Sequence, residues 1–528
     1  MTASSERTAS ATGVDQGMSH VTDGNHDHVV SRWITEGARP DPQRAAIVFP
    51  GHDMTFSELD DGSSRLADAL IGSGLRHGDR VATLTENRPE HVELCFACAK
   101  AGLVLVPLNR FHTATELASQ LRAFTPTLVV GSASHIDRIE EACRLLDRAL
   151  TPLTLERLAS SLPAHSRPVP QPDVRDNDPL LLIPTSGSTG TPKGVILTHA
   201  NCYWTNVSLD LSVPITADDV VLQFLPQYHI GGWNVQPLLA WWKGATVVLE
   251  PKFEPDRVLE LIESQHVTLM MGVPTNYLLL AQHPRFDDAD LTSLRMVVVG
   301  GAAMPPSLLH DWRSRGVDVA QGYGLTEAAP NVLCLAPAEA GDHIGSVGKP
   351  YTHVEVALYD ELTDGFVEGA GRGELFVRGP NVFPGYWNDP KATSEAFHDD
   401  WLRTGDIADR DADGYYRISG RAKEMYVSGG ENVYPVEIER TLAMHADVVE
   451  AAVVATEHPK WGESGAAFVL VRPESDVSVD ELSRHCRAFL ASFKVPTEIH
   501  IVTELPRSPL GKIDKKELGA TLARTHSF

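Results

Sequence analysis

The feature that most constrains this chain is a ten-residue block, rich in glycine and hydroxyl side chains, between two apolar runs. The block reads Thr185-Ser186-Gly187-Ser188-Thr189-Gly190-Thr191-Pro192-Lys193-Gly194. The apolar runs at 180–183 and 195–197 are typical of buried strands. Glycine lets a backbone pass close to a ligand and turn its N–H groups inward, and a lysine adds a point charge. The block therefore predicts a loop that wraps an anionic phosphate chain.

Two alternatives compete with this interpretation: a Walker A loop and a surface linker. The Walker A pattern G-x-x-x-x-G-K-[ST] requires glycine where Pro192 stands and serine or threonine where Gly194 stands, so the block does not match it. A Gly/Ser-rich linker needs no buried strands beside it. The flanking apolar runs and the motifs further along the chain favour the phosphate loop.

Composition limits the class of function. The chain has 528 residues, 42% of them apolar, so we expect two or three lobes. A net charge of −25 argues against nucleic-acid binding. No apolar run reaches the length of a membrane span, and the last residues are not a peroxisomal address, so the cytoplasm is the default location.

The order of strand-like and helix-like segments predicts an α/β fold. They alternate from residue 45 to 299, which indicates βαβ units and a parallel sheet. We expect a large N-terminal lobe of two stacked α/β halves plus a β-rich subdomain, with a small α+β C-terminal lobe. The expected boundaries are a disordered polar tail at 1–29, the large lobe at 30–421 and the small lobe at 422–528.

Several local features have structural interpretations. Cys95 and Cys98 fall in a helix-like segment without a second cysteine pair, which favours two helix-packed thiols over a zinc site. His26 and His28 could hold a metal weakly, but the polar surroundings favour a solvated tail. Ser57 is expected to cap the helix that follows it.

The ten-residue block resembles the phosphate loop of adenylate-forming enzymes. That family includes acyl-CoA synthetases, the adenylation domains of peptide synthetases and beetle luciferases. Its pattern T-S-G-[ST]-T-G-x-P-K-G is matched at every position, and further family blocks follow in the family's order over residues 40–520. The resemblance implies that ATP binds here, with the residues from Thr185 to Lys193 around its phosphates.

A second block, Gln321-Gly322-Tyr323-Gly324-Leu325-Thr326-Glu327, matches the family pattern Y-G-x-T-E. The alternative is a plain glycine-rich turn. The resemblance implies that Tyr323 lies against adenine, Thr326 contacts the α-phosphate and Glu327 binds Mg²⁺, which prefers a carboxylate together with phosphates and water. The turn before it, Gly301-Ala302-Ala303, lines the adenine and acyl pockets in the family.

The remaining family blocks lie nearer the C-terminus: W-x-x-T-G-D ending at Asp406, G-R ending at Arg421, and G-K ending at Lys512. The resemblance implies that Asp406 binds the ribose and that Arg421, with Ile418, lies beside the nucleotide. It makes Lys512 the catalytic lysine and Lys423 the hinge between lobes. It also places Gly429 and Gly430 along the tunnel that receives coenzyme A.

The stretch from Leu225 to Asn234 indicates the kind of acid. It lacks the aspartate that pairs the amine in amino-acid adenylation domains, and 228–239 has no lysine or arginine for a second carboxylate. A monocarboxylic acid with a largely apolar body, a fatty acid or another largely apolar acid, fits better. The predicted pocket residues are His229, Trp233, Asn234, Val273, Gly301 and Gly324. Trp233 resembles the gating tryptophan of some long-chain enzymes, but it could equally be the wall of a closed pocket for an aromatic acid.

The resemblance as a whole implies an ATP-dependent acyl-CoA ligase. It would form an acyl-AMP and pyrophosphate, then pass the acyl group to the thiol of coenzyme A, with Lys512, Glu327, Thr185 and His229 as the catalytic set and Mg²⁺ as the metal. The nearest alternative is an acyl-AMP ligase that loads a carrier protein or another nucleophile. A luciferase-type oxygenase and a non-enzymatic binding module are further alternatives. The oligomeric state stays open between a monomer and a homodimer.

Overall fold

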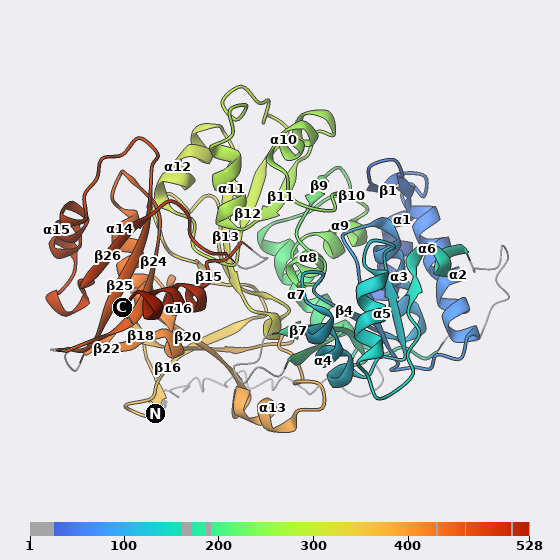
Figure 1. The fold of residues 1–528 in the computed structure, drawn as a ribbon. Helices are drawn as coiled ribbons and strands as arrows, with labels where there is room; N and C mark the ends of the chain where they lie inside the picture. The colour runs from blue at the N-terminus through green and yellow to red at the C-terminus, as the bar shows by residue number, and fades with distance from the viewer. Residues whose placement is uncertain are drawn as a thin grey trace, which may run out of the picture.

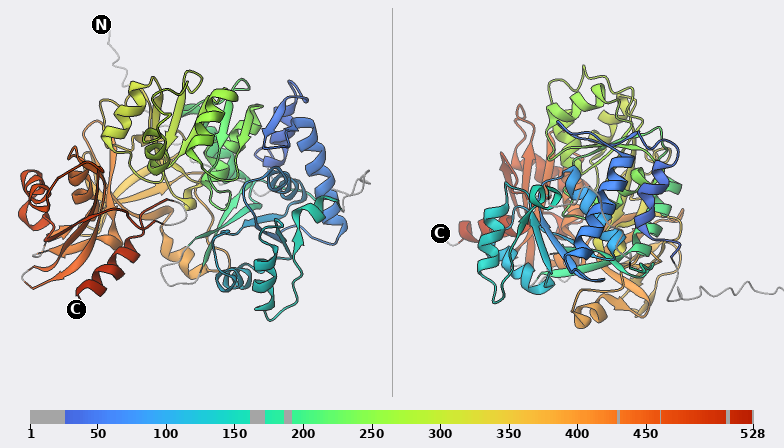
Figure 2. Two further views of the ribbon diagram at one scale, coloured as in Figure 1. Left: turned by 45° about the horizontal axis from the view of Figure 1, so that its top comes forward. Right: turned by 90° about the vertical axis from the view of Figure 1, so that its right-hand side faces the viewer.

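The computed structural model describes residues 26–160, 172–185, 192–428, 431–459, 461–507 and 511–526. Within this part of the chain, four β-sheets and their helices form a large N-terminal lobe and a smaller C-terminal lobe, which lies at one end of an elongated molecule (Figures 1 and 2). The predicted fold class is confirmed. None of the described helices is long and apolar enough to cross a membrane.

The largest sheet has nine strands, and its central strands are parallel. Strands such as Met296-Val297-Val298-Val299 are almost wholly apolar because parallel sheets are covered on both faces. In spatial order the strands are β15 (Lys349–Pro350), β14 (Asn331–Leu335), β13 (Asp318–Gly324), β12 (Met296–Val299), β11 (Leu269–Gly272), β9 (Val220–Gln223), β10 (Thr246–Leu249), β1 (Ala45–Val48) and β2 (Met54–Thr55).

The second sheet has six strands and is inserted in the chain between β2 and β9 of the first. Its strands are parallel except for the last pair, which is antiparallel and flanks the predicted phosphate loop. In order they are β6 (Leu153–Thr154), β5 (Leu128–Gly131), β3 (Arg80–Leu84), β4 (Val104–Pro107), β7 (Pro179–Thr185) and β8 (Lys193–Thr198).

The third and fourth sheets belong to the C-terminal part of the chain. The third is antiparallel and comprises β17 (Gly365–Phe366), β16 (Glu355–Asp360), β18 (Gly371–Arg378), β20 (Trp401–Arg410), β19 (Phe397–His398) and β21 (Tyr416–Arg421). The fourth, in the small lobe, comprises β23 (Glu431–Val433), β22 (Tyr426–Ser428), β25 (Gly462–Val471), β24 (Val448–His458) and β26 (Glu498–Val502). Only four residues separate the two sheets: the 3₁₀ turn η3 (Ala422–Glu424) and Met425.

The helices have local sequence signals at their ends. Helix α3 begins at Pro89, where the missing N–H costs nothing, and ends before Gly102, which takes a left-handed conformation with φ of 61°. The helices are α1 (Trp33–Ala38), α2 (Phe56–Gly72), α3 (Pro89–Ala101), α4 (Ala114–Phe124), α5 (Ile136–Arg144), α6 (Leu155–Ser160), α7 (His199–Ser212), α8 (Gly231–Asn234), α9 (Pro237–Lys243), α10 (Pro255–Ser264), α11 (Pro274–Ala281), α12 (Pro306–Ser314), α13 (Pro390–Ala396), α14 (Pro435–Ala443), α15 (Val479–Phe489) and α16 (Lys515–His526). Further 3₁₀ turns are η1 (Val30–Arg32), η2 (Thr326–Ala328) and η4 (Ser492–Lys494).

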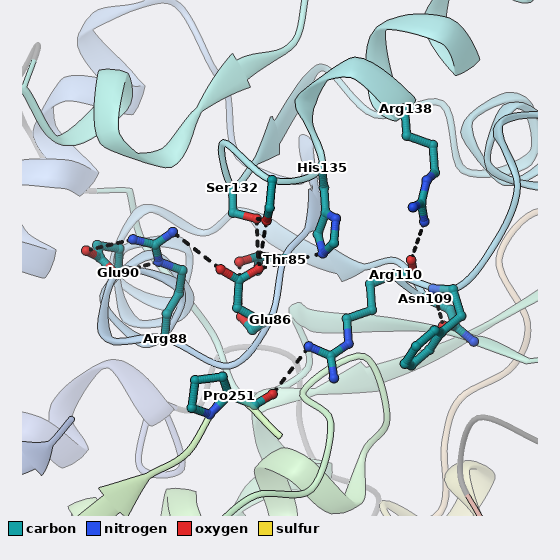
Figure 3. Close-up of polar contacts among 12 residues, drawn as sticks. Thr85, Glu86, Arg88, Glu90, Asn109, Arg110, Ser132, His135, Arg138 and Pro251 are labelled. Atoms are coloured by element: carbon teal, nitrogen blue, oxygen red, sulfur yellow. Dashed lines mark hydrogen bonds and ion pairs between the residues drawn. The ribbon is translucent and has the colours of Figure 1, made fainter. Parts of the chain in front are cut away.

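Polar contacts join the two parallel sheets at the ends of their strands (Figure 3). Arg110, after β4, donates to the carbonyl of Pro251, after β10, at 3.3 Å. Asn87 donates to the carbonyl of Leu225 at 2.9 Å. Since ligands of α/β proteins bind at the carboxyl ends of strands, these contacts fix the two sheets relative to one another beside the site.

Some local predictions were wrong and one is confirmed. Helix α2 is capped by Thr55, which shares a capping box with Glu58, and not by Ser57. The predicted tail boundary at residue 29 is too late, because His28 hydrogen-bonds the buried Asp176 at 2.8 Å and Val29 is buried. Residues 1–25 lie outside the described part. Both cysteines of α3 are buried free thiols, as predicted.

Candidate active site

The predicted nucleotide-binding residues of the large lobe lie at the end of β13 and on the pair β20–β21. Tyr323 belongs to β13 itself, and its hydroxyl donates to Oδ2 of Asp406 at 2.5 Å. The register of β20 and β21 places Asp406 opposite Arg421, whose Nε lies 3.0 Å from Oδ1 of that carboxylate. Burial raises the pKa of Asp406, and Arg421 and Tyr323 act in the opposite direction. The three residues form one connected group.

Lys512 of the small lobe reaches across to the large lobe. A Cβ built on Gly301 would lie 3.4 Å from Cε of Lys512 and 3.4 Å from Val273, so the lysine passes close to the turn after β12. The pKa of Lys512 is lowered, first by burial and then by Arg421, while Asp406 opposes the shift. The structure thus brings Lys512, Gly301, Arg421 and Asp406 together.

Hydrogen bonds hold the segment before Lys512 on the large lobe. The guanidinium of Arg507 donates to Oγ1 of Thr275, at the start of α11, at 3.0 Å and to the carbonyl of Gly511 at 2.9 Å. Thr275 in turn donates to the carbonyl of Gly511 at 3.3 Å. Arg507 also pairs with Glu450 of β24. The motif around Lys512 is therefore fixed to the base of α11.

His229 lies beside this group, immediately before α8. Its Nε2 is buried without a hydrogen-bond partner among the described residues. Burial, Lys512 and His112 lower the pKa of His229 to about 3. The imidazole is therefore neutral at physiological pH, and an N–H of this ring can donate to a ligand oxygen.

Glu327 and Lys193 meet at a residue that sequence reasoning missed. Tyr386 donates its hydroxyl to Oε1 of Glu327 at 2.8 Å, and the ammonium of Lys193 lies 4.7 Å from the centre of the Tyr386 ring. The available signal was an aromatic pair after a glycine, Gly385-Tyr386-Trp387. Across the described residues no group of three or more His, Cys, Asp or Glu could hold a metal. A single carboxylate fits Mg²⁺, which takes its other ligands from phosphates and water.

Two of the predicted pocket residues lie in the interior of the large lobe. Trp233 and Asn234 have no exposed surface. The indole of Trp233 donates to the carbonyl of Gln227 at 2.6 Å, and Asn234 accepts from Asn206 at 3.2 Å. Both belong to the interior of the large lobe, and a contact of either with the acid stays a prediction.

Gly231, which sequence reasoning did not select, is half-buried at the start of α8, where a Cβ would fit without displacing a neighbour. A Cβ built on it would have no atom nearer than 3.9 Å. Gly324, by contrast, has the Pro330 carbonyl 1.8 Å from its ideal Cβ position, so this position requires glycine for close packing.

The remaining predicted site residues are strand supports, exposed or partly exposed residues, or residues outside the described part of the chain. The side-chain amide of Gln321 bonds the backbone at Met304 and Ser346, which makes it a support for the strand. Thr185 donates to the carbonyl of Lys193 at 3.4 Å. Exposed or partly exposed positions are taken by Pro192, Ala302, Ala303, Gly322, Thr326, Ile418 and Lys423. The predicted phosphate-loop residues Ser186, Gly187, Ser188, Thr189, Gly190 and Thr191, and the predicted coenzyme A residues Gly429 and Gly430, lie outside the described residues.

Comparisons with known proteins agree with this arrangement. The family model for AMP-binding enzymes matches residues 34–387, and the model for the AMP-binding enzyme C-terminal domain matches 437–512. The chain is 39% identical over 487 residues to a feruloyl-CoA synthase of Amycolatopsis, covering 92% of this chain and 97% of the relative. It is 37% identical over 513 residues to an indoleacetate–CoA ligase of Aromatoleum aromaticum, covering 94% and 98%.

A solved structure shares both lobes. ATP-bound MatB from Rhodopseudomonas palustris superposes with a TM-score of 0.84 at 32% identity, covering 92% of this chain and 98% of MatB.

The first prediction concerns Trp233. Because its ring is buried and hydrogen-bonded, Trp233→Ala should lower the free energy of unfolding by about 3–5 kcal/mol. Urea unfolding followed by circular dichroism measures this. The control Leu362→Ala, at a side chain that is 94% exposed, should change it by less than about 0.5 kcal/mol. A Trp233→Ala protein of unchanged stability and altered acid preference would instead assign the ring to the substrate pocket.

The second prediction concerns His229. Because its lowered pKa keeps the ring neutral down to pH 4, the rate of acyl-AMP formation should show no protonation of His229 between pH 5.5 and 8. We expect His229→Asn to lower the rate by about tenfold, by the same factor at each pH in that range. Pyrophosphate release at saturating ATP measures it. A wild-type inflection near pH 6.5 that disappears in His229→Asn would contradict the neutral ring.

Proposed function

The chain belongs to the AMP-binding enzyme family, in its acyl-CoA synthetase branch, and from this premise we propose that its acid is an apolar, aromatic monocarboxylic acid. The protein is an ATP-dependent acyl-CoA ligase that works through an acyl-AMP. ATP and coenzyme A are its co-substrates. What the proposal adds is the class of acid, the Mg²⁺ site and the roles of individual residues.

The observation that carries the residue roles is the convergence of Lys512 from the small lobe on Gly301 and the Asp406–Arg421 pair. In the first step an oxygen of the substrate carboxylate attacks the α-phosphorus of ATP, and pyrophosphate leaves. Lys512 neutralises charge that develops between the acid and the α-phosphate, and positioning contributes most of the acceleration. Tyr323 and Asp406 hold the nucleoside, while Lys193 pairs with the departing phosphates.

The metal proposal rests on Glu327. Its Oε1 is held by Tyr386, which leaves the second carboxylate oxygen to serve as a ligand. Mg²⁺ bound there would reduce the negative charge of the phosphates. This requires only one protein carboxylate, in keeping with the preference of Mg²⁺ for phosphate and water ligands.

In the second step the thiol of coenzyme A attacks the acyl carbon, a C–S bond forms and AMP leaves. If the thiol approaches the acyl-AMP from the side on which Lys512 lies, Lys512 must leave the site before the second step. We therefore assign to the exposed Lys423, in the 3₁₀ turn between the third and fourth sheets, the hinge about which the small lobe turns. Gly429 and Gly430, which lie outside the described residues, stay the predicted contacts of the pantetheine arm.

Three observations support an aromatic acid. The relatives reported above are a feruloyl-CoA synthase and an indoleacetate–CoA ligase, both of which act on acids with a ring. Residues 228–239 contain no cation that would pair a second carboxylate. Gly231 has no side chain two residues after His229, whose ring is neutral, and a flat body fits a pocket where a side chain is missing.

A screen of acids with and without coenzyme A tests the activity, and Lys512 tests the assignment of roles. We expect AMP and pyrophosphate from aryl-propenoic and aryl-acetic acids. Lys512→Ala should lower acyl-AMP formation by at least about a hundredfold, because its charge is removed from the reacting centre. Thioester formation from supplied acyl-AMP should survive within about threefold.

Lys516→Ala is the matched control, because this lysine is exposed on α16 near Lys512 in sequence. It should leave both half-reactions unchanged. Equal loss of both half-reactions in Lys512→Ala would contradict the assigned role, and failure of every acid to yield AMP would contradict the proposed substrate class.

Gly231 gives a separate prediction about the width of the pocket. Gly231→Leu should reduce kcat/KM for the aryl acids by about tenfold or more while sparing a short acid such as butyrate, because the leucine side chain would enter the proposed pocket. Gly72→Leu, at a helical glycine whose Cβ would have no neighbour within 4 Å, is the control and should change neither value. An equal loss for aryl and short acids would show that Gly231 does not set the width of the pocket.

A further inference from the structure

We propose that Tyr386 is a positioning residue that separates Lys193 from Glu327 and orients both, so that the lysine stays available to ATP phosphates and the carboxylate to Mg²⁺. The proposal rests on the roles proposed above for Lys193 and Glu327. Tyr386 lies far from both in the sequence, in the segment between β18 and α13, and none of the motifs discussed for the sequence includes it.

The backbone around Tyr386 is fixed to the strand that leaves the phosphate loop. Tyr386 and Val195 of β8 form an antiparallel bridge. The N–H of Ile196 donates to the carbonyl of Gly385 at 3.2 Å, and the N–H of Trp387 donates to the carbonyl of Gly194 at 2.8 Å. Tyr386 therefore has a defined position opposite the first residues of β8, where Lys193 lies.

The side chain of Tyr386 is held as firmly as its backbone. The ring of Tyr386 packs edge to face on Phe383, with centroids 4.9 Å apart. The backbone N–H of Tyr386 donates to Oγ1 of Thr393 at 2.9 Å. Phe383 also donates its N–H to the carbonyl of Glu327 at 2.9 Å. The same short segment thus contacts both the backbone and the side chain of Glu327.

Tyr386 contacts a cation through its ring and an anion through its hydroxyl. The ammonium of Lys193 lies over the ring of Tyr386, and the hydroxyl of Tyr386 donates to the carboxylate of Glu327. Burial and Glu327 raise the pKa of Tyr386, so the phenol stays protonated and must donate this hydrogen bond. Within the described part of the chain, neither Lys193 nor Glu327 forms an ion pair.

A neutral ring between the two charges has a consequence for ligand binding. A lysine and a carboxylate in contact would neutralise each other, and ATP and Mg²⁺ would then have to break that pair. A cation over an aromatic face is attracted more weakly than to a carboxylate, so Lys193 can leave it for a phosphate. The hydroxyl of Tyr386 orients the carboxylate of Glu327 by a hydrogen bond. Groups that orient a metal ligand in this way change the affinity of the site for the metal.

The test compares Tyr386→Phe, which keeps the ring, with Tyr386→Leu, which removes the ring and the hydroxyl. The affinity for ATP is measured by calorimetry in EDTA and again with Mg²⁺, without any acid, so that no turnover occurs. The ratio of the two dissociation constants measures the coupling between Mg²⁺ and ATP. Tyr359→Phe, which loses a hydroxyl that donates to Asp364 elsewhere in the large lobe, is the matched control.

In Tyr386→Phe we expect the Mg²⁺-dependent tightening of ATP to fall by about tenfold, while binding in EDTA stays within about twofold of wild type. In Tyr386→Leu both should weaken, because Lys193 can then pair with Glu327. Glu327→Gln should abolish the tightening, and adding Tyr386→Phe to it should cause no further loss. Tyr359→Phe should bind as wild type does.

Two results would overturn the proposal: unchanged coupling in Tyr386→Phe, or additive losses in the double variant. If Tyr386→Leu does not fold, Tyr386→Phe and the double variant still decide. These binding measurements are independent of acid turnover. A wild type that binds Mg²⁺ and ATP with the expected coupling but yields no AMP contradicts the proposed substrate class alone.

Discussion

The phosphates of a nucleoside triphosphate need cations that are not already paired with carboxylates of the protein. This chain has 70 acidic side chains against 45 lysines and arginines. In such a protein many carboxylates can pair with a cation, as they do with Arg257, Arg295 and Lys515. Within the described residues, Lys193 and Lys512 have no carboxylate partner: one lies over an aromatic ring, the other passes beside Gly301 and Val273. The lowered pKa of Lys512 shows the cost of holding this charge there. The fold thus keeps two cations available for a ligand, in surroundings that stabilise their charge less than a carboxylate would.

Much of the site could be predicted because its residues lie in short motifs. The antiparallel pair β7–β8 around the phosphate loop, the α/β class and the approach of Asp406 to Arg421 and Lys512 follow the order of those motifs. Motif spacing gives the identity of a residue but not the direction of its side chain. Trp233 and Asn234 are on the buried side of α8, and a four-residue helix has too short a pattern to reveal that.

Contacts between distant segments explain the other differences from the sequence-based predictions. Tyr386 matters through β8 and Glu327, which are far from it in the chain. His28 is ordered by Asp176, so polarity alone misplaced the end of the tail. At α2 two hydroxyl residues compete for one cap, and only Thr55 has a glutamate three residues later to complete the capping box.

The contacts between the lobes are suited to being broken and remade. Arg372 of β18 pairs with Glu437 of α14 at 2.8 Å, and Arg507 donates to Thr275. A cavity of about 110 Å³ lies where α11 and α12 face β24. Each hydrogen bond contributes only about 0.5–1.5 kcal/mol net, because water can replace the partner. An orientation held by such contacts costs less to leave than one held by a packed apolar face. Such contacts suit the withdrawal of Lys512 that we propose for the second step, because breaking them would leave the fold of either lobe undisturbed.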